Sequence, residues 1–211
     1  MHKLGAMLAA AALVVATALA GDAATSPERR FAVELQIVAG DLARLRTQDL
    51  PARQRRGLNH RIRSSLSYLP VLARLRTGST GADDDNVVEK VRGLRSRFER
   101  ADYSHLQASL DDLVRRVPLD IDGLRVADAD DEDRADGGEI YATLCRGCHE
   151  NPDPNRDNPA YNLFEQARAL PEREFIARLL GGVRGTPAIG LENPFTDREL
   201  AGLYAYLIKN G

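Results

Sequence analysis

The chain has 211 residues, of which 43% are apolar, and a formal charge of -2 at neutral pH. This length suffices for one domain or two small ones. Nucleic acid is not an expected partner, because proteins that bind DNA or RNA carry basic surfaces that attract phosphates.

The N-terminus has the pattern of a secretory signal. His2 and Lys3 precede an uncharged run, Leu4 to Ala20, which ends in the small-x-small motif Ala18-Leu19-Ala20. We expect cleavage after Ala20, with the end of Gly21-Asp22-Ala23 as the alternative site. An uncleaved membrane anchor is the competing interpretation, but a short run made mostly of alanine is a weak span. The prediction is a signal peptide over 1–20 and an exported, periplasmic protein.

Four successive segments between residues 25 and 118 carry apolar residues at steps of three and four, the spacing of one helix face. We expect Pro70 to break or kink the second segment, and Pro118 to end the fourth. These segments predict an all-α fold that begins with a four-helix bundle over 25–118. The four apolar stripes are Phe31, Leu35, Val38, Leu42 and Leu45; Leu58, Ile62, Leu66 and Leu69; Val87, Val91, Leu94 and Phe98; and Leu106, Leu110, Leu113 and Val117.

Charge divides the chain at the same place. Ala24 to Pro118 holds 18 basic and 12 acidic residues, a net charge of +6, whereas Leu119 to Ile140 holds 2 basic and 9 acidic residues, a net charge of -7. We expect residues 119–135 to form a solvated acidic linker. The basic bundle could dock on an acidic partner or simply be a solvated helical surface.

A five-residue motif after the linker carries the chemistry. Cys145-Arg146-Gly147-Cys148-His149 reads C-x-x-C-H, the attachment site of a c-type haem. Two thiols three positions apart can each form a thioether to one vinyl group of the same porphyrin, and His149 then lies under the iron. A thiol redox motif is the alternative, but it requires a strand–turn–helix setting that the flanking sequence does not indicate. We expect one covalent haem c on Cys145 and Cys148, with His149 as the proximal ligand.

Residues 136–211 resemble a class I cytochrome c domain. Gly137, Tyr141 and Cys145 repeat the family's glycine, aromatic residue and cysteine at steps of four, and Tyr206 stands where the last helix carries its aromatic residue. In that family the glycine lets the first helix cross closely over the last. The resemblance therefore implies a small helical haem domain of this kind.

The resemblance also implies roles for residues that follow the motif. Pro159 matches the family proline whose carbonyl accepts the Nδ1 proton of the proximal histidine, a bond that orients the ligand. The family's distal loop reads Gly-Thr-Pro-Ala-Met, whereas this chain has Gly185-Thr186-Pro187-Ala188-Ile189, so Ile189 stands where the methionine ligand should be. Arg184 is expected to face a haem propionate.

The sixth position of the iron is left open by the sequence. Met1 and Met7, the only methionines, lie in the expected signal peptide. The iron could be five-coordinate under an apolar lid that includes Ile189, or it could bind water or a partner's side chain. A third alternative is another side chain of this chain, but both candidate histidines lie off the apolar stripes and are expected at the surface. The candidates for this ligand are His60, His105, Lys90 and Lys209.

These features predict a mono-haem c-type cytochrome that transfers electrons in the periplasm without a methionine ligand. We expect an electron carrier or redox subunit rather than an enzyme, with an unidentified periplasmic redox partner. The alternative is a five-coordinate haem protein that binds or senses a small ligand such as NO or CO. A haem peroxidase is a third hypothesis, but it requires a distal acid–base pair that the distal loop does not offer.

Overall fold

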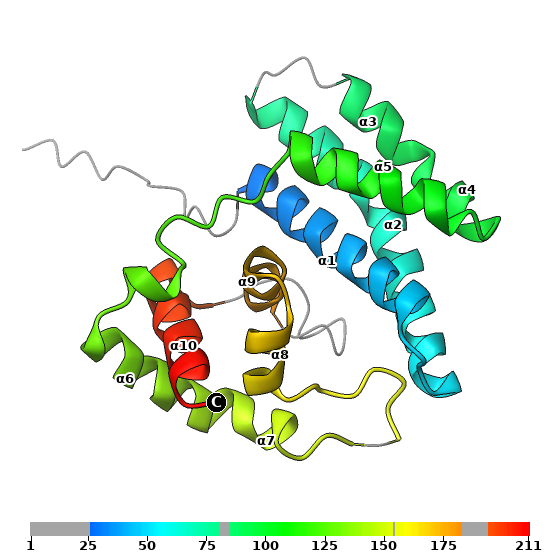
Figure 1. Cartoon of the computed structure of the whole chain (residues 1–211). Coiled ribbons are helices and arrows are strands. Elements are labelled where there is room, and N and C mark those ends of the chain that lie inside the picture. Colours follow the sequence, from blue (N-terminus) through cyan, green and yellow to red (C-terminus); the bar gives the residue numbers. More distant parts are fainter. Residues whose placement is uncertain (1–25, 81–84, 154, 183–193) are drawn as a thin grey trace, which may run out of the picture.

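The computed structural model describes residues 26–80, 85–153, 155–182 and 194–211. These residues form helices and connecting segments with no strand among them, so the predicted all-α class is confirmed (Figure 1). The predicted signal peptide lies outside the described residues. The elements are α1 (Pro27–Thr47), α2 (Ala52–Thr80), α3 (Asp85–Arg92), α4 (Leu94–Glu99), α5 (Tyr103–Arg116), the 3-10 turn η2 (Val126–Asp128), α6 (Asp131–Ile140), the π-helical turn η3 (Tyr141–Cys145), α7 (Arg146–His149), α8 (Leu163–Ala169), α9 (Glu172–Gly181) and α10 (Asp197–Lys209).

Helices α1 to α5 form the N-terminal bundle. α1 packs against α2 and α5, and α3 and α4 pack against α2. Every apolar residue of the four predicted stripes is buried, so the helix faces were correctly identified. The third predicted helix is interrupted at Gly93, where the weak helix propensity of glycine separates α3 from α4. α2 does not end at Pro70 but continues to Thr80.

The C-terminal helices are organised around the crossing of α6 and α10. Gly137 on α6 faces Gly202 on α10 so closely that a Cβ atom on Gly137 would lie 2.3 Å from the Gly202 carbonyl carbon. Only glycine allows two helix backbones to approach to this distance. The predicted role of Gly137 in the crossing of the first and last helices is therefore confirmed. α8 packs on α10, and α9 packs on both of them.

The segment predicted as a solvated linker is packed over its first part. Leu119, Ile121 and Leu124 are buried, and Arg173 of α9 donates a hydrogen bond to the Leu119 carbonyl at 3.1 Å. These three apolar side chains remove hydrophobic surface from water, which a solvated linker would not do. The prediction of a solvated segment is wrong for this part.

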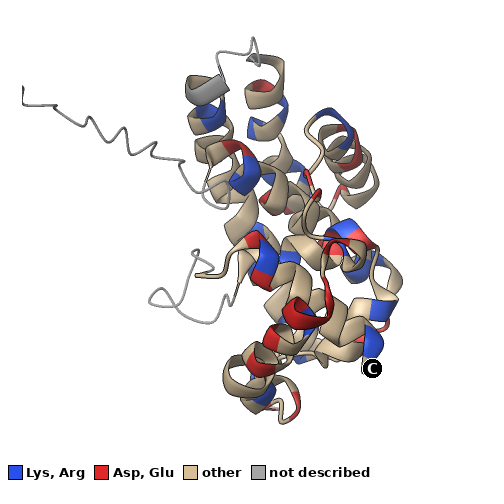
Figure 2. Cartoon of the chain, turned by 90° about the vertical axis from the view of Figure 1, so that its left-hand side faces the viewer, with Lys and Arg blue, Asp and Glu red and all other residues tan. Residues whose placement is uncertain are grey.

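The acidic run itself begins a helix rather than preceding one. Asp130 and Asp133 form a capping box, and α6 starts at Asp131, five residues before the domain start expected at Asp136. Asp131, Glu132 and Asp133 occupy the first turn, where negative charge favours the helix dipole. Figure 2 shows this acidic start of α6, while Lys and Arg are spread over the bundle helices.

A buried ionic cluster joins the bundle to the C-terminal helices. The Asp41 carboxylate on α1 is fully buried and accepts hydrogen bonds from Arg61 of α2 at 2.5 Å and from Arg178 of α9 at 2.9 Å. Arg178 also donates to Glu174 at 2.5 Å. Burial alone would raise the pKa of Asp41, but the two guanidinium groups outweigh this effect and hold its pKa below the usual value. The cluster therefore fastens three helices with paired charges.

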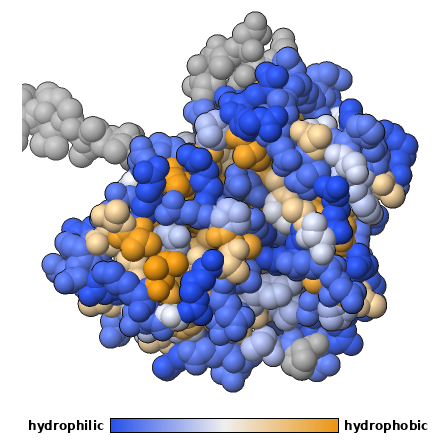
Figure 3. Space-filling view, viewed as in Figure 1, coloured by the Kyte–Doolittle hydropathy of each residue, from blue (hydrophilic) through white to orange (hydrophobic). Residues whose placement is uncertain are grey.

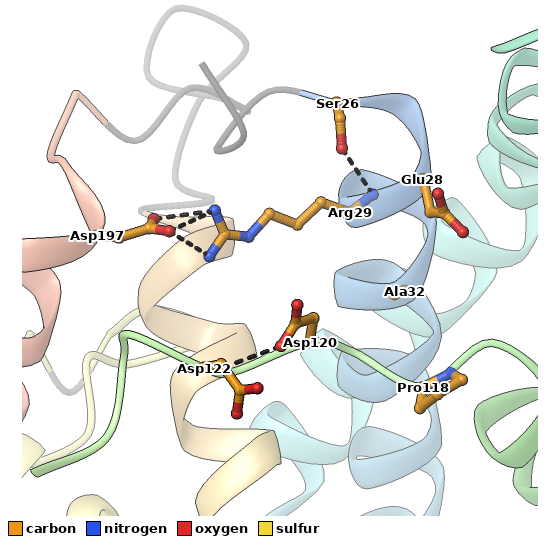
Figure 4. Close-up of a pocket in the computed structure, with 8 residues that line it drawn as sticks. All are labelled: Ser26, Glu28, Arg29, Ala32, Pro118, Asp120, Asp122 and Asp197. Carbon is orange, nitrogen blue, oxygen red and sulfur yellow. Dashed lines mark hydrogen bonds and ion pairs between the residues drawn. The ribbon is translucent and has the colours of Figure 1, made fainter. Parts of the chain in front are cut away.

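A second junction lies at the N-terminus of α1. Arg29 makes a bidentate ion pair with Asp197 at the start of α10, with nitrogen–oxygen distances of 2.9 to 3.0 Å. This pair lines a cavity of about 390 Å³ between α1, the segment around Asp120 and α10 (Figure 4). None of the residues lining this cavity belongs to the cysteine motif.

Candidate functional site

The cysteine motif lies where a π-helical turn passes into a short helix. Cys145 ends η3 and Cys148 lies in α7, and the amide of Arg146 donates to the Tyr141 carbonyl, five residues earlier. Both cysteines are free thiols, Cys145 half-buried and Cys148 exposed. Residues three apart on a helix share one face. The two sulfurs are therefore available on one side of the segment for bonds to a single group.

The environment of Cys145 argues against thiol redox chemistry. Burial, and then the neighbouring Cys148, raise the pKa of the Cys145 thiol above its ordinary value. The reactive thiols of Cys-x-x-Cys redox motifs have a lowered pKa, because the thiolate is the nucleophile. Cys145 thus lacks the activation that the redox interpretation requires.

His149 is fixed by a single hydrogen bond at its inner ring nitrogen. Its Nδ1 lies 2.5 Å from the backbone carbonyl of Tyr161. A carbonyl can only accept, so Nδ1 carries the proton and Nε2 keeps its lone pair for a metal. A histidine held in this way is oriented as an iron ligand.

The residue that accepts this bond differs from the one expected. Pro159 was predicted to supply the carbonyl, but the structure gives that role to Tyr161, two residues further along the chain. Tyr161 directly precedes Asn162, whose side chain caps α8 by accepting from the Glu165 amide. The capped helix start fixes the direction of the Tyr161 peptide, a constraint that the identity of a nearby proline does not reveal. The Asn-x-x-Glu spacing over 162–165 is the sequence signal that could have marked this point.

An aromatic cluster supports the motif from the inner side. The ring of Tyr141 packs edge-on against Phe164 at 4.9 Å and lies 5.7 Å from the ring of Tyr206. The Tyr141 hydroxyl donates to Glu150, the residue after His149, at 3.0 Å. Burial, and then Glu150, raise the pKa of Tyr141 to about 12, so the hydroxyl keeps its proton. The two aromatic positions taken from the resemblance, Tyr141 and Tyr206, therefore meet in the structure.

The surface around the motif suits an apolar macrocycle. Leu144 keeps 66% of its surface exposed, and a Cβ on Gly147 would meet no atom within 4 Å. Figure 3 shows apolar residues at the surface of the C-terminal unit, about where Figure 1 places α10. Burying such surface against a porphyrin would be favourable. Cys145, Cys148 and His149 therefore fit a haem, which when bound would supply a one-electron redox centre.

The residues considered for the distal side of the haem lie in different parts of the chain. Arg184 and Ile189, predicted at the propionate and over the iron, lie outside the described residues. His60 is exposed on α2, and the side chain of His105 is 76% exposed and lies 2.7 Å from Asp102. Lys90 is paired with Asp112 at 2.5 Å.

Within residues 26–80, 85–153, 155–182 and 194–211, none of the helices has the length and hydropathy of a membrane span. The same segments hold no group of three or more His, Cys, Asp or Glu residues that could bind a metal ion.

Comparison with known proteins bears on the C-terminal part alone. Residues 132–207 match the family described as Cytochrome C oxidase, cbb3-type, subunit III. No curated protein and no solved structure matches the chain. The match covers α6, the cysteine motif and most of α10, which are the elements that build the site. Together with the geometry of His149 and the crossing at Gly137, it identifies the C-terminal part of the chain as a class I c-type cytochrome domain, a haem-binding domain of the electron-transfer type.

Proposed function

We propose that the chain is an exported mono-haem c-type cytochrome that transfers electrons in the periplasm. The observation that carries this proposal is the hydrogen bond of His149 Nδ1, which leaves the Nε2 lone pair for a metal in a motif that also has two free thiols. Haem would be attached through thioethers to Cys145 and Cys148. The protein's part is to hold the ligand, bury the cofactor and dock on its partner.

The proposed export rests on the N-terminal pattern. A positive start, an uncharged run and a small-x-small site together are the features of a secretory signal. Signal cleavage after Ala20 would remove Met1 and Met7, the only methionines of the sequence. The secreted form would then have no thioether ligand for the iron.

The sixth position is proposed to lack a strong ligand from this chain. The exposure of His60 and His105 supports this, because a distal ligand has to be drawn inward against the haem. Lys90 is engaged with Asp112 in the bundle. Ile189, at the family's methionine position, has an alkyl side chain that cannot bind iron. An open position also favours the second candidate function, binding or sensing of NO or CO.

Ile189→Met tests the distal assignment. If Ile189 lies over the iron, the new thioether should bind it, giving a low-spin centre with a higher reduction potential. Unchanged optical spectra and potential would contradict the assignment. Binding of CO to the reduced wild-type protein tests whether the sixth position is open, because an iron whose sixth position is filled by a strong ligand would not take up the gas.

The partner is proposed to be another periplasmic redox protein. The net charge of +6 over Ala24 to Pro118 supports docking on an acidic surface. Such docking should slow with added salt, because screening weakens electrostatic steering. Electron-transfer rates that are independent of ionic strength would contradict an electrostatic docking surface on the bundle.

A further inference from the structure

The segment that accepts the hydrogen bond of the proximal histidine is in contact with the N-terminal bundle. We call residues 150–162, between α7 and α8, the proximal strap; its residue 154 lies outside the described part. Tyr161 lies near the end of the strap, and its carbonyl accepts from His149. In Figure 1 the strap, drawn in yellow, runs beside the end of α1 and the start of α2. Contacts with these two helices can therefore act on the position of the carbonyl.

Arg44 of α1 holds the end of the strap. Its guanidinium carbon lies 4.9 Å from the centre of the Tyr161 ring, and its Nη2 donates to the Gln166 side chain of α8 at 3.0 Å. Arg44 is buried, with 7% of its surface exposed, so little solvent weakens the cation–π contact. One side chain of the bundle thus touches the residues on both sides of the α8 cap.

Gly57 of α2 receives the middle of the strap. A Cβ atom at Gly57 would lie 2.4 Å from the Asp157 carbonyl oxygen and 2.5 Å from the Asn158 side chain. The Asn158 amide group donates to the Gly57 carbonyl at 3.3 Å, and Arg56 lies 3.6 Å from the Asp157 carboxylate. Because the nearest atom belongs to the backbone, a methyl group here would have to displace the strap itself.

We propose that the N-terminal bundle tunes the haem iron, with Arg44 and Gly57 as positioning residues for His149. They act by holding the Tyr161 carbonyl on Nδ1. A strong hydrogen bond at Nδ1 makes Nε2 a better electron donor, which stabilises ferric iron and lowers the reduction potential. The inference rests on the proposed haem attachment and gives the bundle a role in it.

The test compares two pairs of variants in the full-length protein carrying its haem. Arg44→Ala removes the cation–π contact with Tyr161. Its control is Arg46→Ala, on the exposed side of the same helix. Gly57→Ala pushes the strap, and its control is Gly78→Ala, where a Cβ meets nothing within 4 Å. Midpoint potential and the NMR resonance and solvent exchange of the His149 Nδ1 proton are measured well below the unfolding temperature.

We expect Arg44→Ala and Gly57→Ala to have a more positive potential, a shifted Nδ1 proton resonance and faster exchange of that proton. Both controls should behave as wild type. Arg44→Lys should restore part of the change, because it keeps a cation near the ring. Tyr161→Phe should change little, since it retains the ring and the carbonyl.

Wild-type potential and an unmoved Nδ1 resonance in both test variants would overturn the proposal, even if their melting temperatures fall. Equal shifts in the controls would also overturn it. If Gly57→Ala does not accumulate, the Arg44 series decides alone. Failure of the wild-type chain to acquire covalent haem would refute the proposed function instead, so the two failures are distinguishable.

Discussion

The Asp41 cluster should be the strongest electrostatic link between the bundle and the cytochrome domain. Asp41→Asn keeps the shape of the side chain but removes its charge, which leaves Arg61 and Arg178 with only Glu174 among the partners described above. Removing one partner of a buried ion pair costs about 3–5 kcal/mol. The side chains of both arginines keep 20% of their surface exposed, so water offsets part of this cost. We expect the lower end, about 3 kcal/mol.

Chemical denaturation measures the loss in the free energy of unfolding directly. In a thermal melt, a loss of about 3 kcal/mol in a chain of this length corresponds to a fall of roughly 6 to 12 °C in melting temperature. Far-UV circular dichroism reports the helices of both parts together, and haem absorption reports the cytochrome domain alone. Asp49→Asn, at an exposed position just after α1, is the control and should be neutral. An Asp41→Asn protein within about 0.5 kcal/mol of wild type, the range of surface substitutions, would contradict this role of Asp41.

The lowered pKa of Asp41 means that its stabilisation is complete above about pH 4 and is lost as the pH falls toward the lowered value. Acid titration of stability should therefore be steeper for wild type than for Asp41→Asn. Gly137→Ala should cost about 1–3 kcal/mol by overpacking against the α10 backbone, measured by urea unfolding. Gly93→Ala, which meets only one atom at 3.8 Å, should be neutral or stabilise by up to about 1 kcal/mol in the same assay. Tyr141→Phe should cost about 1 kcal/mol by thermal melting, because it removes the hydrogen bond to Glu150.

Periodicity predicted the helices well, because burial of one helix face leaves a direct record in the sequence. The stripe from Phe31 to Leu45 is buried along its whole length. The close crossing at Gly137 was also predictable, because Gly137, Tyr141 and Cys145 match the spacing of the class I cytochrome c family. Local signals were less reliable at Gly93, which divides a predicted helix, and at Pro70, where the expected break does not occur and a kink stays a prediction.

The site was predictable only within the contiguous motif. Cys145, Cys148 and His149 lie within five residues of one another, so their spacing indicates haem attachment. Tyr161 acts through its backbone carbonyl, a group that every residue type has, so the sequence does not reveal this role. Arg44 lies more than 100 residues from the motif along the chain and looks like any other arginine of a basic bundle. Its role depends on the packing of the two units, which composition and spacing do not encode.

The linker prediction failed for a related reason. A run of acidic residues is typical of solvated segments, but Asp130 and Asp133 use their charge to cap α6. Three apolar residues before the run were too few to form a periodic stripe, yet they bury against the core. The division of the chain into separable domains stays a prediction, which limited proteolysis around residues 119–135 would test.

The most direct test of the central claim is the mass of the denatured chain after expression in cells that export and mature c-type cytochromes. We expect one polypeptide carrying the added mass of one haem, which is retained after acid–acetone extraction. Replacing both Cys145 and Cys148 by serine should remove that added mass. A wild-type chain without covalent haem, or one that releases its haem intact on extraction, would contradict the claim.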